Sequence, residues 1–145
     1  RRPFRLRVMG TAHLSLPGLD VECEPWSAAR EIDVIRSFDV GLMPLRADEW
    51  SRGKYLKAIQ YLALGVPAVG TRHGVLRDII RDGENGLLAD SPEEWVEKMD
   101  RALADRQLRE RLSREGRRTA EERYSGQVWA PRFIDILRRT ARGLP

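Results

Sequence analysis

The sequence predicts an α/β domain in which a parallel sheet is flanked by helices and followed by a helical C-terminal third. Over the first two-thirds of the chain, short apolar runs alternate with stretches of helical periodicity, a pattern typical of β-α-β units. Charged residues at helical spacing fill the last third. The length of 145 residues corresponds to about one domain, so residues 1–145 are expected to form a single unit.

Two strands and a helix are expected in the N-terminal region. Apolar residues alternate over 4–10, which predicts a strand ending in a turn at Gly10, and 19–24 predicts a second strand. Ser27 is expected to cap a helix that ends at Ser37. Its apolar side would carry the residues that recur at helical spacing, namely Ile32, Val34, Ile35 and Arg36.

The central apolar run, residues 38–45, is closed by Pro44 and predicts a buried strand at 39–43. After a polar loop, an amphipathic helix is predicted to begin at Lys54 and to end at Gly65, which suits a C-cap. A helical projection places one set of side chains toward the core: Tyr55, Ala58, Ile59, Leu62 and Ala63. The opposite arc, directed away from the core, holds Lys54, Lys57, Gln60 and Tyr61.

A strand at 66–70, a short helix at 74–81 and a final strand at 87–89 follow in order. The sequence DGENG at 82–86 predicts a tight turn before that last strand. Three of its residues are suited to positive φ angles: Gly83, Asn85 and Gly86.

The C-terminal third is predicted to be helical. Ser91 and Glu94 form the pattern of a capping box, with Pro92 in the first helical position. The buried side of that helix would consist of Trp95, Met99, Ala102 and Leu103. Residues 105–123 continue as a solvated helix, and 125–145 as a C-terminal helix that Pro131 should start or kink. The expected ion pairs are Glu94 with Lys98, Glu97 with Arg101, Asp105 with Arg109 and Glu110 with Arg114.

The composition excludes several classes of protein. Basic residues exceed acidic ones by only four, which does not by itself indicate binding to nucleic acid. One cysteine and two histidines cannot form a cluster with the spacing of metal ligands, so we expect no metal site. The sequence shows neither an apolar run long enough to span a membrane nor a secretion signal, and we expect a cytoplasmic location.

The loop before the helix at Lys54 is the strongest candidate for a binding site. In parallel α/β sheets, ligands bind beyond the carboxyl ends of strands, where loops meet helix N-termini. Free N–H groups and the helix dipole favour an anion there, and Gly53 lets an anion approach the backbone. Positive charge from Arg52, Lys54 and Lys57 is unfavourable at a helix N-terminus unless an anion offsets it. We therefore expect phosphate to bind this loop.

Gly10, Arg72 and His73 are further candidates, because they also lie at the ends of predicted strands. The sequence contains no Ser-His-acid order, no paired-carboxylate motif, no Walker motif and no GxGxxG. A complete hydrolase or kinase site is therefore not expected.

The segments FDVGLMPL, QYLALGVPAVG and DGENGLL resemble the C-terminal half of GT-B-fold glycosyltransferases, in the retaining group known as group 1 or family 4. The resemblance is strong over Phe38–Ala89. It implies a Rossmann-like domain that holds a nucleotide-diphosphate sugar, while an N-terminal domain absent from this chain holds the acceptor. The sugar would be transferred with retention in the cleft between the two, without a cofactor.

The resemblance also implies roles for particular residues. N–H groups and cations would stabilise the charge on the departing diphosphate, and the residues concerned are Trp50, Ser51, Arg52, Gly53, Lys54 and Lys57. Gln60 occupies the position of the family's second acidic residue and is suited to a ribose hydroxyl. The first acidic position falls on Arg52, which leaves Glu49 or Asp48 as the catalytic candidate.

In this family, the first strand and its glycine-rich turn would precede Arg1. We therefore expect the chain to be part of a domain and unable to transfer sugar alone. A lipid-linked acceptor would bring it to the inner face of a membrane as a peripheral protein. The resemblance leaves the base, the sugar and the acceptor open.

Two other functions are compatible with parts of the sequence. The Arg-rich helices between Arg106 and Arg142 could form a nucleic-acid-binding module, but interleaved acidic residues disfavour this, and we expect no nucleic acid partner. A non-catalytic regulatory domain of the same fold would need an acidic pocket at the end of the first strand. The sequence has Gly10, Thr11 and Ala12 there.

Overall fold

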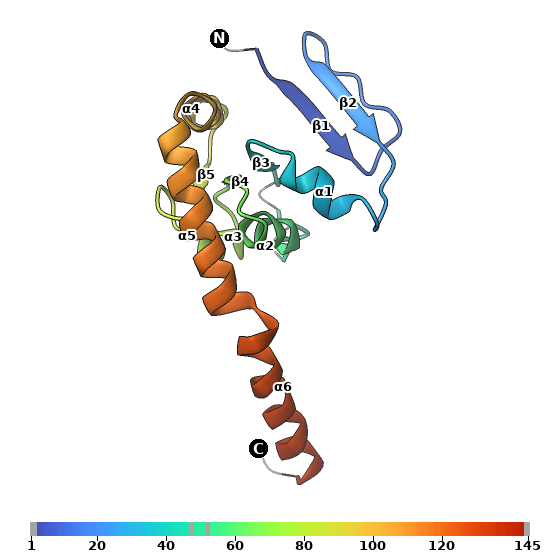
Figure 1. Cartoon of the computed structure of the whole chain (residues 1–145), viewed down its shortest axis with the longest axis vertical. Helices are drawn as coiled ribbons and strands as arrows, with labels where there is room; N and C mark the ends of the chain where they lie inside the picture. The colour runs from blue at the N-terminus through green and yellow to red at the C-terminus, as the bar shows by residue number, and fades with distance from the viewer. Residues whose placement is uncertain (1–2, 47, 52, 144–145) are drawn as a thin grey trace.

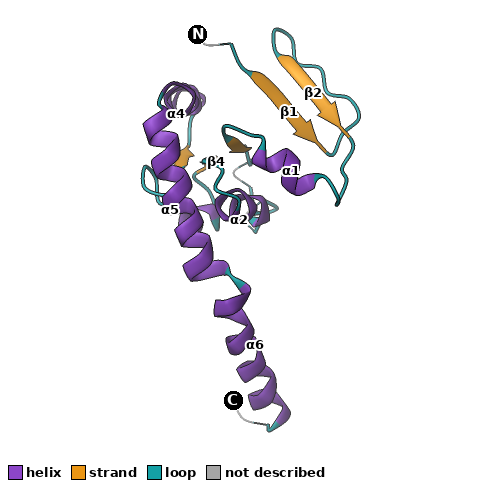
Figure 2. Cartoon of the chain, viewed as in Figure 1, coloured by secondary structure: helices purple, strands orange, loops and turns teal. Residues whose placement is uncertain are grey.

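The computed structural model describes residues 3–46, 48–51 and 53–143. Figures 1 and 2 show its helices and strands. The strands are β1 (Arg5–Met9), β2 (Asp20–Glu24), β3 (Gly41–Met43), β4 (Ala68–Thr71) and β5 (Leu87–Ala89). The helices are α1 (Glu31–Arg36), α2 (Leu56–Ala63), α3 (Leu76–Ile79), α4 (Pro92–Ala104), α5 (Arg106–Tyr124) and α6 (Gly126–Ala141).

All strand pairs are parallel, which confirms the predicted α/β class. The described strands nevertheless form two sheets, one ordered β1-β2 and the other β3-β4-β5. Arg5 lies opposite Asp20 in the first sheet, and Gly41 lies opposite Ala68 in the second. The short helix α1 leads from the first sheet to the second (Figure 1).

The core surrounds the three-stranded sheet, in which every residue of β4 and β5 is buried. Alternate residues of these strands face opposite sides, as the pleat of a sheet requires. Ala68 and Leu88 belong to a cluster with side chains of α2 and α3. Val69 and Leu87 belong to a second cluster with side chains of α4 and α5. Helices therefore cover both faces of this sheet.

The predicted cap of α1 is wrong. The helix begins at Glu31, and Ser27 contributes only its backbone carbonyl, which accepts the N–H groups of Arg30 and Glu31. The helix starts three residues later than a cap at Ser27 would place it, and of the predicted apolar side only Val34 and Ile35 are buried. Ile32 is 51% exposed.

Helix α2 also differs from its prediction. It begins at Leu56, so Lys54 precedes the first turn instead of lying in it. Tyr61 was expected on the outer face but is buried, and its ring packs so closely on Gly41 that a Cβ there would lie 2.7 Å from ring carbons. The helix is enclosed by β3 on one side and α5 on another, which widens its buried arc.

The turn before β5 is held by a buried side chain. Only Gly83 has a positive φ, at 79°, whereas Asn85 and Gly86 do not. Asn85 is fully buried: its Nδ2 donates to the Ile79 carbonyl and to Thr119 Oγ1, and its Oδ1 accepts the Arg81 N–H. The prediction placed Asn85 in the turn for its backbone freedom, but its side chain is what ties the turn to α3 and α5.

The start of α4 matches the predicted capping box in part. The Ser91 hydroxyl accepts the Glu94 N–H, but the Glu94 carboxylate accepts the N–H of Asp90 and not that of Ser91. On the buried side, Ala102 is fully buried, while Trp95, Met99 and Leu103 are half-buried.

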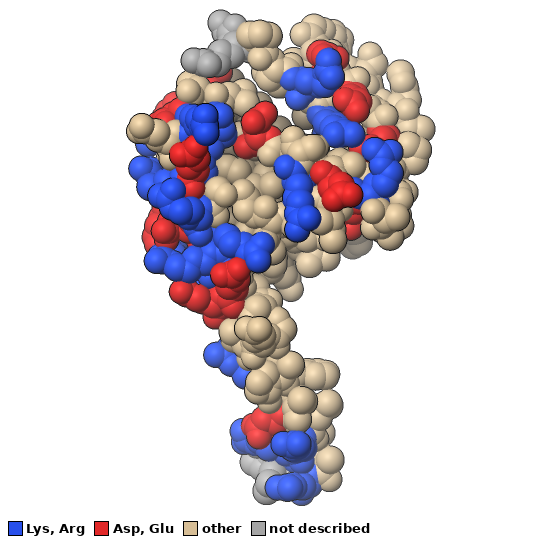
Figure 3. Space-filling model, in the orientation of Figure 1, with Lys and Arg blue, Asp and Glu red and all other residues tan. Residues whose placement is uncertain are grey.

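The ion pairs along the C-terminal helices differ from those predicted from spacing. Arg106 pairs with Glu110, and Arg117 with Glu121. Asp105 instead caps α5 by accepting the Leu108 N–H. Basic and acidic side chains remain intermixed over α5 (Figure 3), which leaves this helix without a continuous basic face there.

Helix α6 extends away from the rest of the molecule (Figure 1). It begins at Gly126 under the cap of Ser125 and continues through Pro131, which neither starts nor ends it. None of the residues described in it is buried, and its exposed apolar residues include Trp129, Phe133, Ile134, Ile136 and Leu137.

Candidate functional site

Two loops from the carboxyl ends of neighbouring strands are tied together. One follows β3 and the other follows β4. The Leu45 N–H donates to Thr71 Oγ1 over 2.9 Å. Nε2 of His73 lies 3.0 Å from the carbonyl oxygen of Asp48. Because a carbonyl can only accept, this nitrogen bears the proton. His73, predicted as a ligand contact, thus holds the candidate loop in place.

The loop after β3 is folded around Ser51, which is 5% exposed. Its N–H donates to Asp48 Oδ1 over 2.9 Å, and its hydroxyl contacts the carbonyls of Arg46 and Asp48. The bond from the Ser51 N–H, followed by that from its hydroxyl, lowers the pKa of Asp48. Asp48 therefore remains ionised and acts within the loop, and Ser51 shapes the site instead of projecting into it.

The N-terminus of α2 is open. Tyr55 occupies the N-cap position without a side-chain hydrogen bond, and no acidic residue lies in the first turn. The Nζ of Lys54 lies 5.2 Å from the ring centroid of Trp50, which is 81% exposed. A Cβ added at Gly53 would meet no atom within 4 Å, so nothing in the described structure fills the space beside this backbone. The arrangement presents N–H groups and a cation to solvent.

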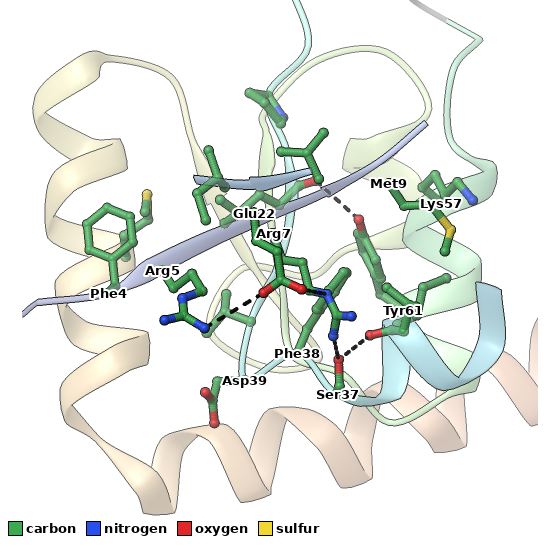
Figure 4. Close-up of a pocket in the computed structure, with 18 of the residues that line it drawn as sticks. Phe4, Arg5, Arg7, Met9, Glu22, Ser37, Phe38, Asp39, Lys57 and Tyr61 are labelled. Carbon is green, nitrogen blue, oxygen red and sulfur yellow. Dashed lines mark hydrogen bonds and ion pairs between the residues drawn. The ribbon is translucent and has the colours of Figure 1, made fainter. Parts of the chain in front are cut away.

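Lys57 forms an ion pair with Glu31 of α1. The hydrogen bond from Lys57, opposed by partial burial, lowers the pKa of Glu31. Lys57 also lines the pocket drawn in Figure 4. Its ammonium is therefore held by α1, beside the pocket that residues of β1 also line.

Replacing Lys57 by Ala is expected to raise the pKa of Glu31 toward its ordinary value. A carboxylate whose pKa is lower in the folded protein than in the unfolded chain stabilises the fold at pH values above its unfolded-state pKa. This stabilisation is lost as the pH falls through its folded-state pKa. A carbon-13 NMR titration of side-chain carboxyls measures the shift. The pKa of Glu93, lowered by its own backbone N–H and by Ser91, serves as the control and should not move. An unchanged pKa of Glu31 in the variant would contradict the ion pair.

Gln60 lies one turn along α2 from the open end. Its Oε1 is buried and finds no hydrogen-bond partner within the described residues. A buried amide oxygen without a partner is unusual and costs free energy. Among the predicted site residues that the structure describes, Gln60 is the one with a buried side-chain polar atom that has no hydrogen-bond partner.

Neither Gly10 nor Arg72 contributes to this loop. Gly10 follows β1 directly, has a φ of 114°, and donates its N–H to the Glu24 carbonyl of β2. Arg72 is bound to Asp82, Asp90 and the Leu88 carbonyl at 3.0 to 3.2 Å, which fixes the β5 turn. Glu49 is exposed at the loop surface. Arg52 lies outside the described residues.

The sequence reasoning assigned no role to two residues that shape the candidate site. Glu31 sets the position of Lys57, although it lies 26 residues away in the chain. Thr71 ties the two loops together through its hydroxyl. A threonine that ends an apolar strand is a recognisable local signal, whereas nothing local indicates the partner of Glu31.

The described residues contain no group of three or more His, Cys, Asp or Glu side chains able to hold a metal ion. Within the same part of the chain, each helix is too short or too polar to cross a bilayer.

Comparison with known proteins gives consistent results. A family model described as "Glycosyl transferases group 1" matches residues 2–105. The lipopolysaccharide core biosynthesis glycosyltransferase LpsE of Rhizobium meliloti is 26% identical over 122 residues, which are 83% of this chain and 32% of that protein. The chain spans about a third or less of the length of the curated relatives it matches.

Solved structures share the fold. The C-terminal domain of a group 1 glycosyl transferase, LpcC from Francisella tularensis, has a TM-score of 0.63 at 22% identity, covering 74% of this chain and 55% of that one. HepE of Anabaena, in complex with UDP-glucose, has a TM-score of 0.70 at 16% identity, covering 81% and 32%.

Proposed function

Because this chain belongs to the group 1 glycosyl transferases, we propose that it forms the donor-binding part of a retaining glycosyltransferase. The proposed donor is a nucleotide-diphosphate sugar, and its diphosphate would lie at the N-terminus of α2. The observation that supports this most is the absence of a side-chain cap and of any acidic residue in that first turn. A helix end left in this state favours an anion.

The surrounding cations fit a diphosphate. Lys54 stands beside the open helix end on the ring of Trp50, where its ammonium is free to reach an anionic oxygen. Lys57, already paired with Glu31, would exchange part of that contact for phosphate. Negative charge grows on the diphosphate as the bond to the sugar breaks, so cations and N–H groups held in place lower the barrier.

The proposal assigns the nucleoside side of the donor to Gln60. Its amide oxygen, unsatisfied within the described structure, would accept a hydrogen bond from a ribose hydroxyl once the side chain turns toward the loop. HepE, which shares the fold, was solved with UDP-glucose, and this makes a uridine donor a suitable first probe. Glu49 is the proposed catalytic carboxylate, no metal or cofactor is invoked, and the acceptor would bind a separate N-terminal domain.

A titration with UDP, GDP and ADP, each with and without an attached sugar, tests donor binding. Saturable amide shifts at Gly53, Lys54 and Gln60 are expected for one nucleotide. A short DNA duplex at two salt concentrations serves as the comparison, because binding through phosphate contacts weakens steeply with salt. Shifts caused by the duplex and by no nucleotide would overturn the donor proposal. If no nucleotide causes a saturable shift, the proposal is also wrong.

Replacing Lys54 or Lys57 by Ala is expected to weaken binding of the nucleotide diphosphate about tenfold, which corresponds to ~1.4 kcal/mol. Isothermal titration calorimetry measures the change. Lys98→Ala is the matched control, since Lys98 belongs to α4, pairs with Asp82 in the turn before β5 and lies in another part of the molecule. Unchanged affinity in both test variants would rule out the site.

A further inference from the structure

Trp50 is exposed to an unusual degree. Its side chain is 81% exposed, a larger fraction than for any other large apolar side chain that the structure describes. Tryptophan is highly buried on average in folded proteins. Where an indole does face water, it is often part of a binding surface, because it offers a large apolar face and one polar group. Trp50 is therefore a candidate for contact with a ligand instead of for packing.

The backbone on both sides of Trp50 is held in place. The Asp48 carbonyl oxygen lies 3.0 Å from Nε2 of His73. The buried Ser51 donates its N–H to Asp48 Oδ1 over 2.9 Å, and its carbonyl accepts the Lys54 N–H over 3.0 Å. A ring carried by a backbone that is already ordered loses less conformational entropy when it binds. The loop thus presents the indole as a preorganised surface.

The ammonium of Lys54 covers one face of this ring. Its Nζ lies 5.2 Å from the ring centroid, within the ~6 Å over which an aromatic face attracts a cation. At an exposed site this attraction is weak, whereas a charge-assisted hydrogen bond from an ammonium to a phosphate oxygen is strong. A diphosphate at the N-terminus of α2 would therefore draw Lys54 off the ring. The vacated face would then lie beside the bound phosphate.

The order of groups in a nucleotide-diphosphate sugar brings the sugar to this ring. The diphosphate of such a donor lies between the nucleoside and the sugar. Gln60, to which the ribose is assigned above, lies one turn into α2, whereas Trp50 precedes the helix. A donor with its diphosphate at the helix N-terminus and its ribose near Gln60 therefore extends its sugar toward Trp50.

A pyranose ring has the chemistry that this loop fits. The face of an indole is negatively polarised, and it attracts the weakly positive C–H groups on one side of a pyranose. The hydroxyl groups around the rim of the sugar need hydrogen-bond acceptors. Asp48 and Glu49 directly precede Trp50 in the chain, and carboxylate oxygens accept such bonds.

We infer that Trp50 binds the sugar ring of the donor, which stacks on the ring face from which the diphosphate removes Lys54. This assigns Trp50 to the sugar, whereas the family resemblance implies that it acts on the diphosphate. The inference rests on the proposed function, since it concerns the sugar of the same donor. Trp50 then contributes affinity that only the sugar-bearing nucleotide can use.

Calorimetric titration of Trp50→Ala with paired ligands tests the inference. The pairs are UDP with UDP-glucose, GDP with GDP-mannose and ADP with ADP-glucose, and the pair that binds the unaltered protein most tightly is used. In Trp50→Ala, the affinity for the sugar-bearing nucleotide relative to the free nucleotide should fall about fivefold. The affinity for the free nucleotide should stay the same or rise slightly, because the ring no longer holds Lys54.

Two further variants serve as controls. Trp50→Phe keeps an aromatic face and should retain most of the preference for the sugar-bearing nucleotide. Trp129→Ala removes an indole from α6 that also lies under a cation, with the Arg132 guanidinium 5.2 Å from the ring centroid. It should leave both affinities unchanged. Circular dichroism should be the same for Trp50→Ala and the unaltered protein, because so exposed a ring adds little to the fold.

Proton NMR of the bound ligand gives a second readout. Protons above the face of an aromatic ring shift upfield, so the C–H protons of the sugar should shift upfield on binding to the unaltered protein and to Trp50→Phe. They should not do so on binding to Trp50→Ala.

The results that would overturn the inference differ from failure of the proposed function. Equal weakening of both ligands in Trp50→Ala would mean that the ring contacts the nucleoside or the diphosphate. Unchanged affinities for both would mean that the ring does not contact the donor. In each of these cases the unaltered protein still binds the nucleotide. If it binds no nucleotide at all, the proposed function is wrong, and the inference fails with it.

Discussion

Replacing Asn85 by Ala is expected to lower the free energy of unfolding by about 3 kcal/mol. Asn85 is fully buried and makes three hydrogen bonds, to Arg81, Ile79 and Thr119. Its removal leaves the Arg81 N–H and the Ile79 carbonyl without partners, and each such buried group costs roughly 1 to 3 kcal/mol. Small domains are stable by only ~5 to 15 kcal/mol, so the loss is a large fraction. Urea denaturation followed by circular dichroism measures it.

Two matched variants sharpen this prediction. Thr119→Val removes two hydrogen bonds of the Thr119 hydroxyl, the one from the Asn85 amide and the one to the Glu115 carbonyl. It should lower the free energy of unfolding by about 1 kcal/mol. Gln107→Ala removes an amide from an exposed position on α5 and should change stability by less than ~0.5 kcal/mol. An effect of Asn85→Ala as small as that of Gln107→Ala would show that the turn before β5 does not depend on this side chain.

Replacing Leu56 by Glu is expected to change stability and donor binding in opposite directions. Leu56 is the first residue of α2 and is 65% exposed, so the new side chain meets little steric hindrance. A carboxylate in the first turn stabilises a helix by about 0.3 to 1 kcal/mol. The same charge would repel a diphosphate bound there, by roughly 2 kcal/mol or about thirtyfold in affinity.

The neutral variant Leu56→Gln is the control, because it has nearly the same size and no charge. Thermal denaturation and calorimetric titration with UDP-glucose are measured on all three proteins. Equal affinity of the Glu and Gln variants would mean that the diphosphate does not bind at the N-terminus of α2. A contrast between them that shrinks in high salt would identify the repulsion as electrostatic.

Much of the fold could be predicted from local sequence. The strand at Leu87–Ala89 has the predicted bounds, and β1, β2, β3 and β4 lie within a residue or two of theirs. Apolar runs bounded by glycine, proline and polar turns specify such strands directly. The cap of α4 at Ser91 was predictable for the same reason, because a hydroxyl followed three residues later by glutamate acts over one turn.

The orientation of helices was less predictable, since it depends on what surrounds them. A projection of α2 placed Tyr61 outside, yet the ring fits against Gly41, a residue without a side chain 20 positions earlier. Which ion pairs form along α5 depends on nearby backbone carbonyls that compete for the arginines, as well as on spacing in the sequence. Arg109, for example, donates to the carbonyls of Ala102 and Leu103 instead of pairing with Asp105.

For the candidate loop too, local sequence predicted the position but not the contacts that hold it. The sequence was enough to predict a candidate loop after β3 and to name the cations in it. The rule used, that ligands bind where strand ends meet helix N-termini, needs only the order of the elements. The sequence did not show that Ser51 and His73 are used to hold the loop, nor that Lys57 meets Glu31. The contacts of His73 and Lys57 join residues that lie 25 and 26 positions apart in the chain and meet only on folding.

The sequence by itself determined the α/β class, the position of most strands and the family, and it predicted the loop where an anion would bind. These depend on periodicity, turn residues and short motifs, all of which act over a few residues. Only the tertiary structure decided which side chains are buried, how the candidate loop is tied, and that β1 and β3 line the same groove. Those features depend on contacts between distant segments, and such contacts are selected by packing and by the pairing of buried polar groups.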